Sequence, residues 1–103
     1  MEAPIRTLDT QRIAPDTYVI RQLMGEGVAP VAIHVNSMVI TGEEPVIVDT
    51  AVALNREPWM EKVFELVDPV DVRWIYLSHD DTDHTGNLLQ VLDRCPNATL
   101  VTN

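Results

Sequence analysis

The segment His79-Asp80-Asp81-Thr82-Asp83-His84 lies between an apolar strand-like stretch, Val72 to Leu77, and a helix-like stretch that begins near Thr85. Its side chains include potential metal ligands at four positions: His79, Asp81, Asp83 and His84. In extended or looped backbone, alternate residues point to the same side, so the first three of these ligands can converge. The fourth, at the start of the helix, can turn its ring toward a neighbouring point. One short loop could therefore hold two metal ions a few ångströms apart.

Two other interpretations of the segment remain open. It could be a solvated acidic turn in which Asp and Thr cap the following helix. It could also be a calcium loop, because hard oxygen ligands suit calcium, although the two histidines and the absence of EF-hand spacing argue against this. Without cations, three aspartates within four positions would repel one another at neutral pH unless some stay protonated.

The pattern before the segment predicts a β-hairpin and a helix. Val31 to Ile40 and Pro45 to Thr50 are apolar and rich in β-branched residues, and the short turn Thr41-Gly42-Glu43-Glu44 joins them. Such a pair is typical of antiparallel strands. Tyr18 to Ile20 resembles a further short strand, and a helix is expected from about Glu57 to Val67, where apolar residues recur at helical spacing.

The order along the chain is therefore hairpin, helix, strand, acidic loop, helix and strand. The last two elements are a helix from about Thr85 to Arg94 and a strand that starts near Ala98. This order predicts an α/β fold in which helices pack on a sheet. The acidic loop falls where a strand ends and a helix begins, which is a usual place for ligands in such folds. Trp59 and Phe64 are expected in the core.

Composition limits the partners. The chain has 103 residues, 46% of them hydrophobic, and a formal net charge of −9, which makes nucleic acid an unfavourable partner. No apolar run approaches the roughly 18 residues that span a membrane, and Met1-Glu2-Ala3-Pro4 lacks the features of a signal peptide, so we expect a cytoplasmic protein that does not bind membranes. The single Cys95 cannot form an internal disulfide and is expected to be a partly buried thiol.

The run Leu77 to Leu88 resembles the signature of the metallo-β-lactamase superfamily, His-x-[His/Glu/Asp]-x-Asp-His followed by a small residue and glycine. Asn36 to Ile40 and Val46 to Thr50 resemble the family's first hairpin with its Asp-Thr ending. The resemblance covers about residues 18–103. It implies the N-terminal half of an αββα sandwich. Residues 1–17 precede the resemblance, and their mixed composition with Pro4 and Pro15 predicts an irregular lead-in or an edge strand. The resemblance also implies that Asp49 is a supporting residue that steadies the motif loop.

The third position of the motif departs from the zinc hydrolases of the superfamily, which usually have histidine there. Asp81 instead resembles the carboxylate of flavodiiron proteins and related oxygen-binding di-iron proteins. A carboxylate makes a harder site, which suits iron or manganese better than zinc. By resemblance, His79 and Asp81 would bind one metal ion, and Asp83 and His84 the other.

The family's fold is typically about twice as long as this chain. Its second half normally supplies a histidine, a bridging aspartate and a final histidine, whereas the only histidine outside the motif is the upstream His34. We therefore expect residues 1–103 to be a partial domain that lacks the second half of the fold and is inactive alone. The two predicted helices can cover only one face of the sheet. Either the second half of the fold or self-association is expected to cover the other, open sheet face. A flavin would come only from a missing domain or from a partner.

Three functional hypotheses follow. The first is a dinuclear non-haem iron protein that handles oxygen or nitric oxide as a reductase or sensor. The second is a zinc-dependent hydrolase of a thioester, phosphoester or lactam, in which a metal-bound hydroxide attacks the substrate and Asp83 orients the water from which it forms. The third is a non-catalytic binding or sensor domain that retains the motif. The reductase and the hydrolase would make the intact protein an enzyme acting on a small-molecule substrate, whereas the sensor and the binding domain would not.

Overall fold

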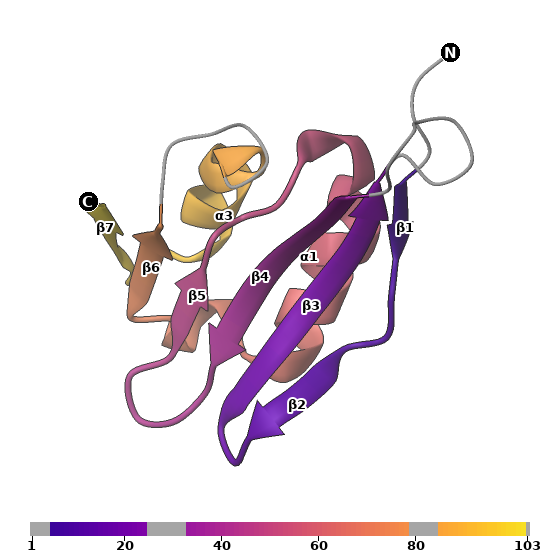
Figure 1. Cartoon of the computed structure of the whole chain (residues 1–103). Coiled ribbons are helices and arrows are strands. Elements are labelled where there is room, and N and C mark those ends of the chain that lie inside the picture. Colours follow the sequence, from indigo (N-terminus) through magenta and orange to yellow (C-terminus); the bar gives the residue numbers. More distant parts are fainter. Residues whose placement is uncertain (1–4, 25–32, 79–84, 103) are drawn as a thin grey trace.

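A computed structural model describes residues 5–24, 33–78 and 85–102, which form a mixed β-sheet with helices packed on one of its faces (Figure 1). The sheet order is β1-β3-β4-β5-β6-β7, and β2 pairs with β3 beside β1. The strands are β1 (Ile5–Thr7), β2 (Gln11–Ala14), β3 (Thr17–Met24), β4 (Ile33–Ile40), β5 (Val46–Val48), β6 (Trp74–Leu77) and β7 (Thr99–Thr102). The helices are α1 (Arg56–Leu66) and α3 (Leu88–Arg94), with short 3-10 turns η1 (Ala53–Asn55) and η2 (Pro69–Asp71).

The antiparallel half of the sheet contains the predicted hairpin. β4 pairs with β5 through Met38↔Val48 and Ile40↔Val46, so the expectation of two antiparallel strands around the turn is confirmed. β3 is longer than the predicted Tyr18–Ile20, because it pairs with β4 along its whole length, polar residues included. The predicted lead-in contains the two short strands β1 and β2, both antiparallel to β3.

The parallel half is the predicted strand–helix alternation. β5 pairs in parallel with β6, and β6 in parallel with β7, while α1 and α3 make the crossovers. α3 starts later than the predicted helix, at Leu88 rather than near Thr85, because Gly86 and Asn87 form a turn. Neither residue favours a helix interior, and the Asn87 side chain bonds to backbone carbonyls of another segment.

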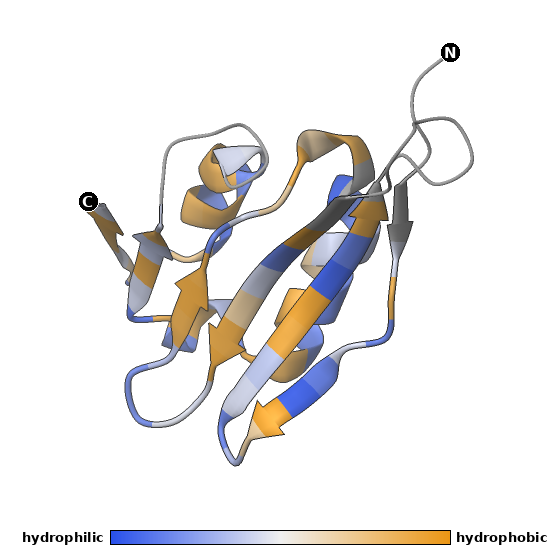
Figure 2. Cartoon of the chain, in the orientation of Figure 1, coloured by the Kyte–Doolittle hydropathy of each residue, from blue (hydrophilic) through white to orange (hydrophobic). Residues whose placement is uncertain are grey.

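Both helices lie on the same face of the sheet (Figure 2), and apolar side chains of each are buried there. One cluster joins the two helices to the central strands; its fully buried members include Trp59, Val63, Val91, Ile20, Val39, Ile47 and Ile75. The Trp59 indole N–H donates a 2.6 Å hydrogen bond to the hydroxyl of Ser37 on β4, so its polar atom is satisfied inside the core. Trp59 is thus a core residue, as expected, while Phe64 is half-buried and packs against that cluster.

The opposite face of the sheet carries apolar side chains that no described helix covers. On β4, Val35, Ser37 and Val39 are buried on the helix side, whereas the alternate residue Asn36 is exposed and Met38 is half-buried. β6 repeats this alternation along its length. We call this uncovered side the open sheet face. Among the described residues, no helix is long and apolar enough to cross a membrane.

Candidate metal centre

The four predicted metal ligands, His79, Asp81, Asp83 and His84, lie outside the described residues. The structure instead describes the chain on either side of them, up to Ser78 and again from Thr85. Within the described part of the chain, no group of three or more histidine, cysteine, aspartate or glutamate side chains is placed to hold a metal ion. His34 belongs to β4, but its side chain is also outside the description.

The residues that flank the motif, Ser78 on one side and Gly86 and Asn87 on the other, lie against one short segment, residues 49–52, that follows β5. The amide of Asp49 donates a 2.8 Å hydrogen bond to the carbonyl of Tyr76 on β6, which continues the parallel pairing beyond the end of β5. Asp49 and Ala51 both have positive φ, 63° and 58°, a conformation that costs non-glycine residues free energy. This conformation also explains why β5 ends at Val48, before the predicted Thr50.

Asp49 holds the N-terminal side of the motif. Its carboxylate accepts two hydrogen bonds from Ser78, from the backbone N–H to Oδ1 at 2.8 Å and from the hydroxyl to Oδ2 at 2.7 Å. The carboxylate is almost fully buried, with the residue only 5% exposed. Since Ser78 directly precedes His79, these bonds fix the backbone from which the motif starts. A role of Asp49 in steadying the motif loop would act through these bonds, and that role stays a prediction.

Gly86 holds the C-terminal side by close approach of backbone to backbone. Its N–H donates a 2.8 Å hydrogen bond to the carbonyl of Ala51. A Cβ placed on Gly86 would lie 2.5 Å from that oxygen, 2.5 Å from the nitrogen of Ala53 and 2.7 Å from the Cα of Val52. All three atoms are backbone and cannot rotate away, so only glycine fits here.

Asn87 is a fully buried polar residue that the sequence analysis missed. Its Nδ2 donates to the carbonyls of Thr50, at 2.8 Å, and Val52, at 3.0 Å, while its Oδ1 accepts a 2.9 Å hydrogen bond from Nε of Arg56. The sequence did offer a signal for the burial of Asn87. This polar residue follows the glycine of the motif directly, at the expected start of an apolar helix. Arg56, more than 30 positions away in the chain, offered none.

The donor set and its anchoring fit a metal site. Two imidazoles and two carboxylates suit divalent first-row metals, with the carboxylates favouring iron or manganese. Both ends of the segment that bears them are held to residues 49–52 by the contacts of Asp49, Gly86 and Asn87. Such support limits the conformational entropy that ligands lose on binding a metal.

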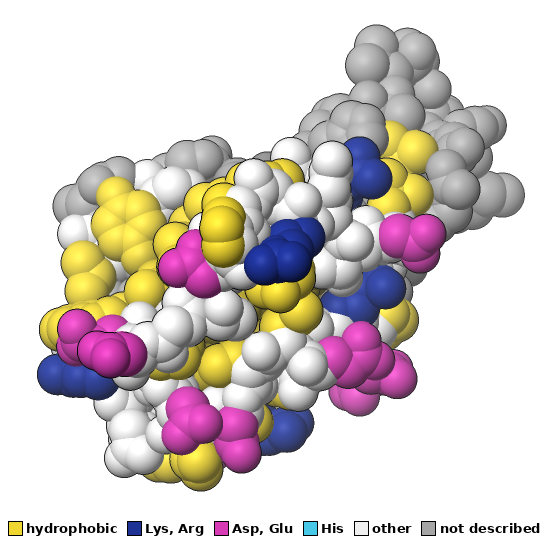
Figure 3. All heavy atoms as spheres, turned by 90° about the horizontal axis from the view of Figure 1, so that it is seen from below, with side chains coloured by type: hydrophobic (Ala, Val, Ile, Leu, Met, Phe, Trp, Pro, Cys, Tyr) yellow, Lys and Arg dark blue, Asp and Glu magenta, His cyan; other side chains and the backbone are white. Residues whose placement is uncertain are grey.

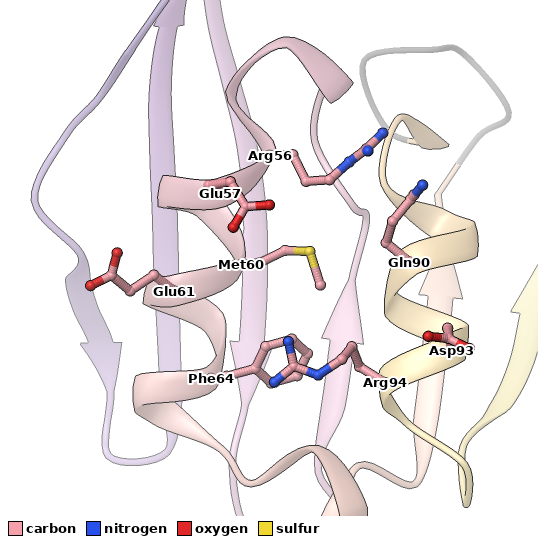
Figure 4. A pocket seen from close by; sticks show the side chains of 8 residues that line it. All are labelled: Arg56, Glu57, Met60, Glu61, Phe64, Gln90, Asp93 and Arg94. Carbon is pink, nitrogen blue, oxygen red and sulfur yellow. The ribbon is translucent and has the colours of Figure 1, made fainter.

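Two hollows in the described surface are not lined by Asp49, Ser78, Gly86 or Asn87. A groove of about 510 Å³ is lined by side chains of α1 and α3 alone (Figure 4), among them Arg56, Met60, Phe64 and Arg94. A smaller one of about 300 Å³ borders the β4–β5 turn and carries Glu43, Asp68 and Asp71. In Figure 3, which views the molecule from below, the acidic side chains form separate groups with basic and apolar side chains between them.

Cys95 lies at the end of α3 and is buried against the core, as the sequence suggested. Burial raises the pKa of its thiol from 9.0 to about 11, against the opposing effect of the neighbouring Arg94 guanidinium. The thiol is therefore protonated at neutral pH, which does not suit a nucleophile or a metal ligand.

Comparison with known proteins identifies the relatives of this chain. A protein of Thermosynechococcus vestitus named as a diflavin flavoprotein is 33% identical over 105 residues, which cover 95% of this chain but 18% of that protein. A nitric oxide reductase of Moorella thermoacetica is 27% identical over 63 residues, covering 61% of this chain and 16% of that protein. The chain thus spans less than a fifth of the length of these curated relatives.

The fold agrees with solved structures of the same group. A variant of the flavo di-iron protein of Thermotoga maritima superposes with a TM-score of 0.79 at 19% identity, over 96% of this chain and 27% of that one. The model of the metallo-beta-lactamase superfamily matches residues 31–102, which include the hairpin, α1, the motif and α3. The structure and the family match confirm the fold predicted from the motif and the hairpin, and the chain belongs to the metallo-beta-lactamase superfamily.

Proposed function

We propose that this chain is the first part of a dinuclear non-haem iron protein that handles oxygen or nitric oxide, as a reductase or a sensor. The observation that carries the proposal is Asp81, a carboxylate at the motif position where zinc hydrolases of the superfamily usually have histidine. Harder oxygen ligands favour iron or manganese over zinc. The names of the relatives, a diflavin flavoprotein and a nitric oxide reductase, support the same assignment.

In this proposal the ligands divide into two pairs. His79 and Asp81 hold one metal ion, and Asp83 and His84 hold the other. When bound, the metal ions would supply the binding positions for the diatomic ligand and the redox chemistry, with electrons delivered to them from the flavin. The protein contributes ligand geometry and the hydrogen bonds behind it, as those of Asp49 to Ser78 illustrate. The flavin that would feed electrons to this site belongs to another domain or to a partner.

Residues 1–103 form a partial domain in this proposal, and further chain supplies the remaining metal ligands. The half-buried apolar side chains of the open sheet face, such as Met38 and Trp74, support this view. They are covered when a second sheet packs against them.

The competing hypothesis is a zinc hydrolase in which Asp83 orients a metal-bound water. Elemental analysis of the native gene product, expressed with iron and zinc both available, separates the two. We expect iron in the wild-type protein and a shift toward zinc in the Asp81→His variant. Asp80→His is the matched control, because it makes the same substitution at the adjacent position that the motif does not assign to a metal.

Two results would contradict the proposal. One is a zinc-filled wild-type site together with esterase or lactamase activity. The other is an unchanged metal preference in Asp81→His, which would show that ligand hardness at this position does not select the metal. A site that binds iron without any turnover of oxygen or nitric oxide would indicate the sensor rather than the reductase.

A further inference from the structure

Asn87 makes a complete set of hydrogen bonds in the core, and this set dictates how its side chain is oriented. Both of its backbone acceptors, the carbonyls of Thr50 and Val52, lie on the Nδ2 side of the carboxamide. The oxygen must therefore face away from them, toward α1, where Nε of Arg56 donates to it. A flipped carboxamide would set its oxygen against two carbonyl oxygens, so the orientation is determined by the contacts themselves.

Arg56 provides the hydrogen-bond donor for the buried side-chain oxygen of Asn87. It is the first residue of α1, half-buried, and its hydrogen bond is charge-assisted, which makes it stronger than a neutral one. Figure 4 shows the Arg56 side chain reaching from α1 toward α3 across the upper end of the groove. The bond therefore joins α1 to the residue that precedes α3, and through Asn87 to residues 50–52.

The motif ligands lie close to this junction in the chain. Asn87 follows His84 by three positions and Asp83 by four, and each residue extends the backbone by at most about 3.6 Å. Gly86 is fixed to Ala51 by its own hydrogen bond, so the chain is anchored two positions after His84. A change in the position of Asn87 therefore passes to the ligands over a short path.

We propose that Arg56 and Asn87 are positioning residues for the metal ligands of the motif. Asn87 ties the C-terminal side of the ligand segment to residues 50–52, and Arg56 holds the Asn87 carboxamide in the required orientation. This inference rests on the proposed metal site and names two residues outside the motif that set its geometry. Partners that orient metal ligands typically change metal affinity by about 10- to 100-fold when they are removed.

The test compares two arginines of the same groove in the native gene product. Arg56→Ala removes the bond to Asn87, whereas Arg94→Ala removes the same charge from a side chain that stacks on Phe64, with 4.8 Å between the guanidinium carbon and the ring centroid. Metal affinity is measured by titrating the metal-free protein with cobalt(II), whose visible absorption also reports coordination geometry. Thermal unfolding of the metal-free proteins is measured in parallel.

We expect Arg56→Ala to weaken cobalt(II) binding roughly tenfold and to alter the absorption spectrum, while Arg94→Ala leaves both unchanged. Arg56→Lys, which keeps a cationic donor, should recover part of the affinity. Asn87→Asp should lose more than Arg56→Ala, because its carboxylate still accepts from Arg56 but repels the carbonyls of Thr50 and Val52.

An Arg56→Ala protein with wild-type affinity and spectrum would overturn the inference. So would a loss of affinity that is matched by Arg94→Ala, or one explained entirely by unfolding of the metal-free protein. Asp83→Asn distinguishes this failure from failure of the proposed function. If Asp83→Asn abolishes metal binding while Arg56→Ala does not affect it, only the positioning role is wrong; if Asp83→Asn keeps the metal, the proposed site itself is wrong.

Discussion

The thiol of Cys95 gives a pH dependence that a single residue accounts for. Its pKa is raised from 9.0 to about 11 by burial in the folded protein. Below pH 9 the thiol is protonated in both the folded and the unfolded chain. Between pH 9 and 11 the unfolded chain releases the proton while the folded chain retains it, so the free energy of unfolding falls as the pH rises. The shift corresponds to about 2 to 3 kcal/mol in total.

The measurement is the free energy of unfolding at pH 8 and at pH 10.5, in wild type and in Cys95→Ala. Other groups that titrate in this range affect both proteins equally and cancel in the difference between them. We expect the wild type to lose more stability than the variant. An equal loss in both proteins would show that the thiol is not shielded as the structure indicates.

Contacts and backbone conformations of individual residues were the features that the sequence did not predict. Asp49 was singled out because it ends an apolar strand in a family pattern, and its hydrogen bonds to Ser78 could not be read from that pattern. The bond between Arg56 and Asn87 joins residues 31 positions apart, and no local periodicity reports such a contact. The positive φ of Asp49 and Ala51 was missed for a related reason, since neither residue type requires that conformation.

At the scale of elements, the junction between β6 and α3 depends on Gly86. In Gly86→Ala the added methyl group must displace the backbone of residues 51–53, because each atom it would meet is main chain. We expect the variant to lose metal binding along with some stability, as the ligand segment moves. Gly42→Ala is the control: nothing lies within 4 Å of the added carbon, but its φ of +123° is strained for alanine.

Metal content and thermal unfolding of the two glycine variants separate local strain from displacement of the ligands. Gly42→Ala should lose stability and keep its metal. Gly86→Ala should lose both. Full metal occupancy in Gly86→Ala would contradict the expectation that the close packing between Gly86 and residues 51–53 is needed for metal binding.

Hydrophobic pattern predicted the kind of every main element but placed some ends wrongly. The helical spacing around Trp59 and Val63 located α1 to within one residue at each end. The start of α3 was misplaced by three residues, because Gly86 and Asn87 form a turn that is hydrogen-bonded to a distant backbone segment. The length of β3 was underestimated, since pairing with β4 extends it across the polar residues Arg21 and Gln22.

At the scale of the whole molecule, the open sheet face predicts how the 103-residue chain behaves alone. The face bears half-buried apolar side chains on neighbouring strands, including Val46, Val48, Trp74 and Tyr76. Contiguous apolar surface beyond a few hundred Å² is rare on soluble monomers. We expect residues 1–103, produced alone, to self-associate and to hold metal weakly.

Light scattering and metal analysis of the isolated chain test this expectation. Replacing Val48 and Tyr76 with threonine, which keeps strand propensity and lowers apolar area, should reduce the self-association. Val70→Thr is the control, because that exposed apolar side chain belongs to η2 rather than to the sheet. A monodisperse wild-type monomer with stoichiometric, tightly bound metal would show that the domain is complete within these residues.

The turn between β4 and β5 offers a place for chemical labelling. Gly42, Glu43 and Glu44 are exposed, and they precede β5, whereas the motif follows the other end of the neighbouring parallel strand β6. A fluorophore attached to cysteine at position 43 would therefore lie at the opposite end of the strands from the ligand segment. With Cys95 buried and its thiol protonated, maleimide coupling at pH 7 would favour the new cysteine, so folding and assembly could be followed optically without altering the proposed metal ligands.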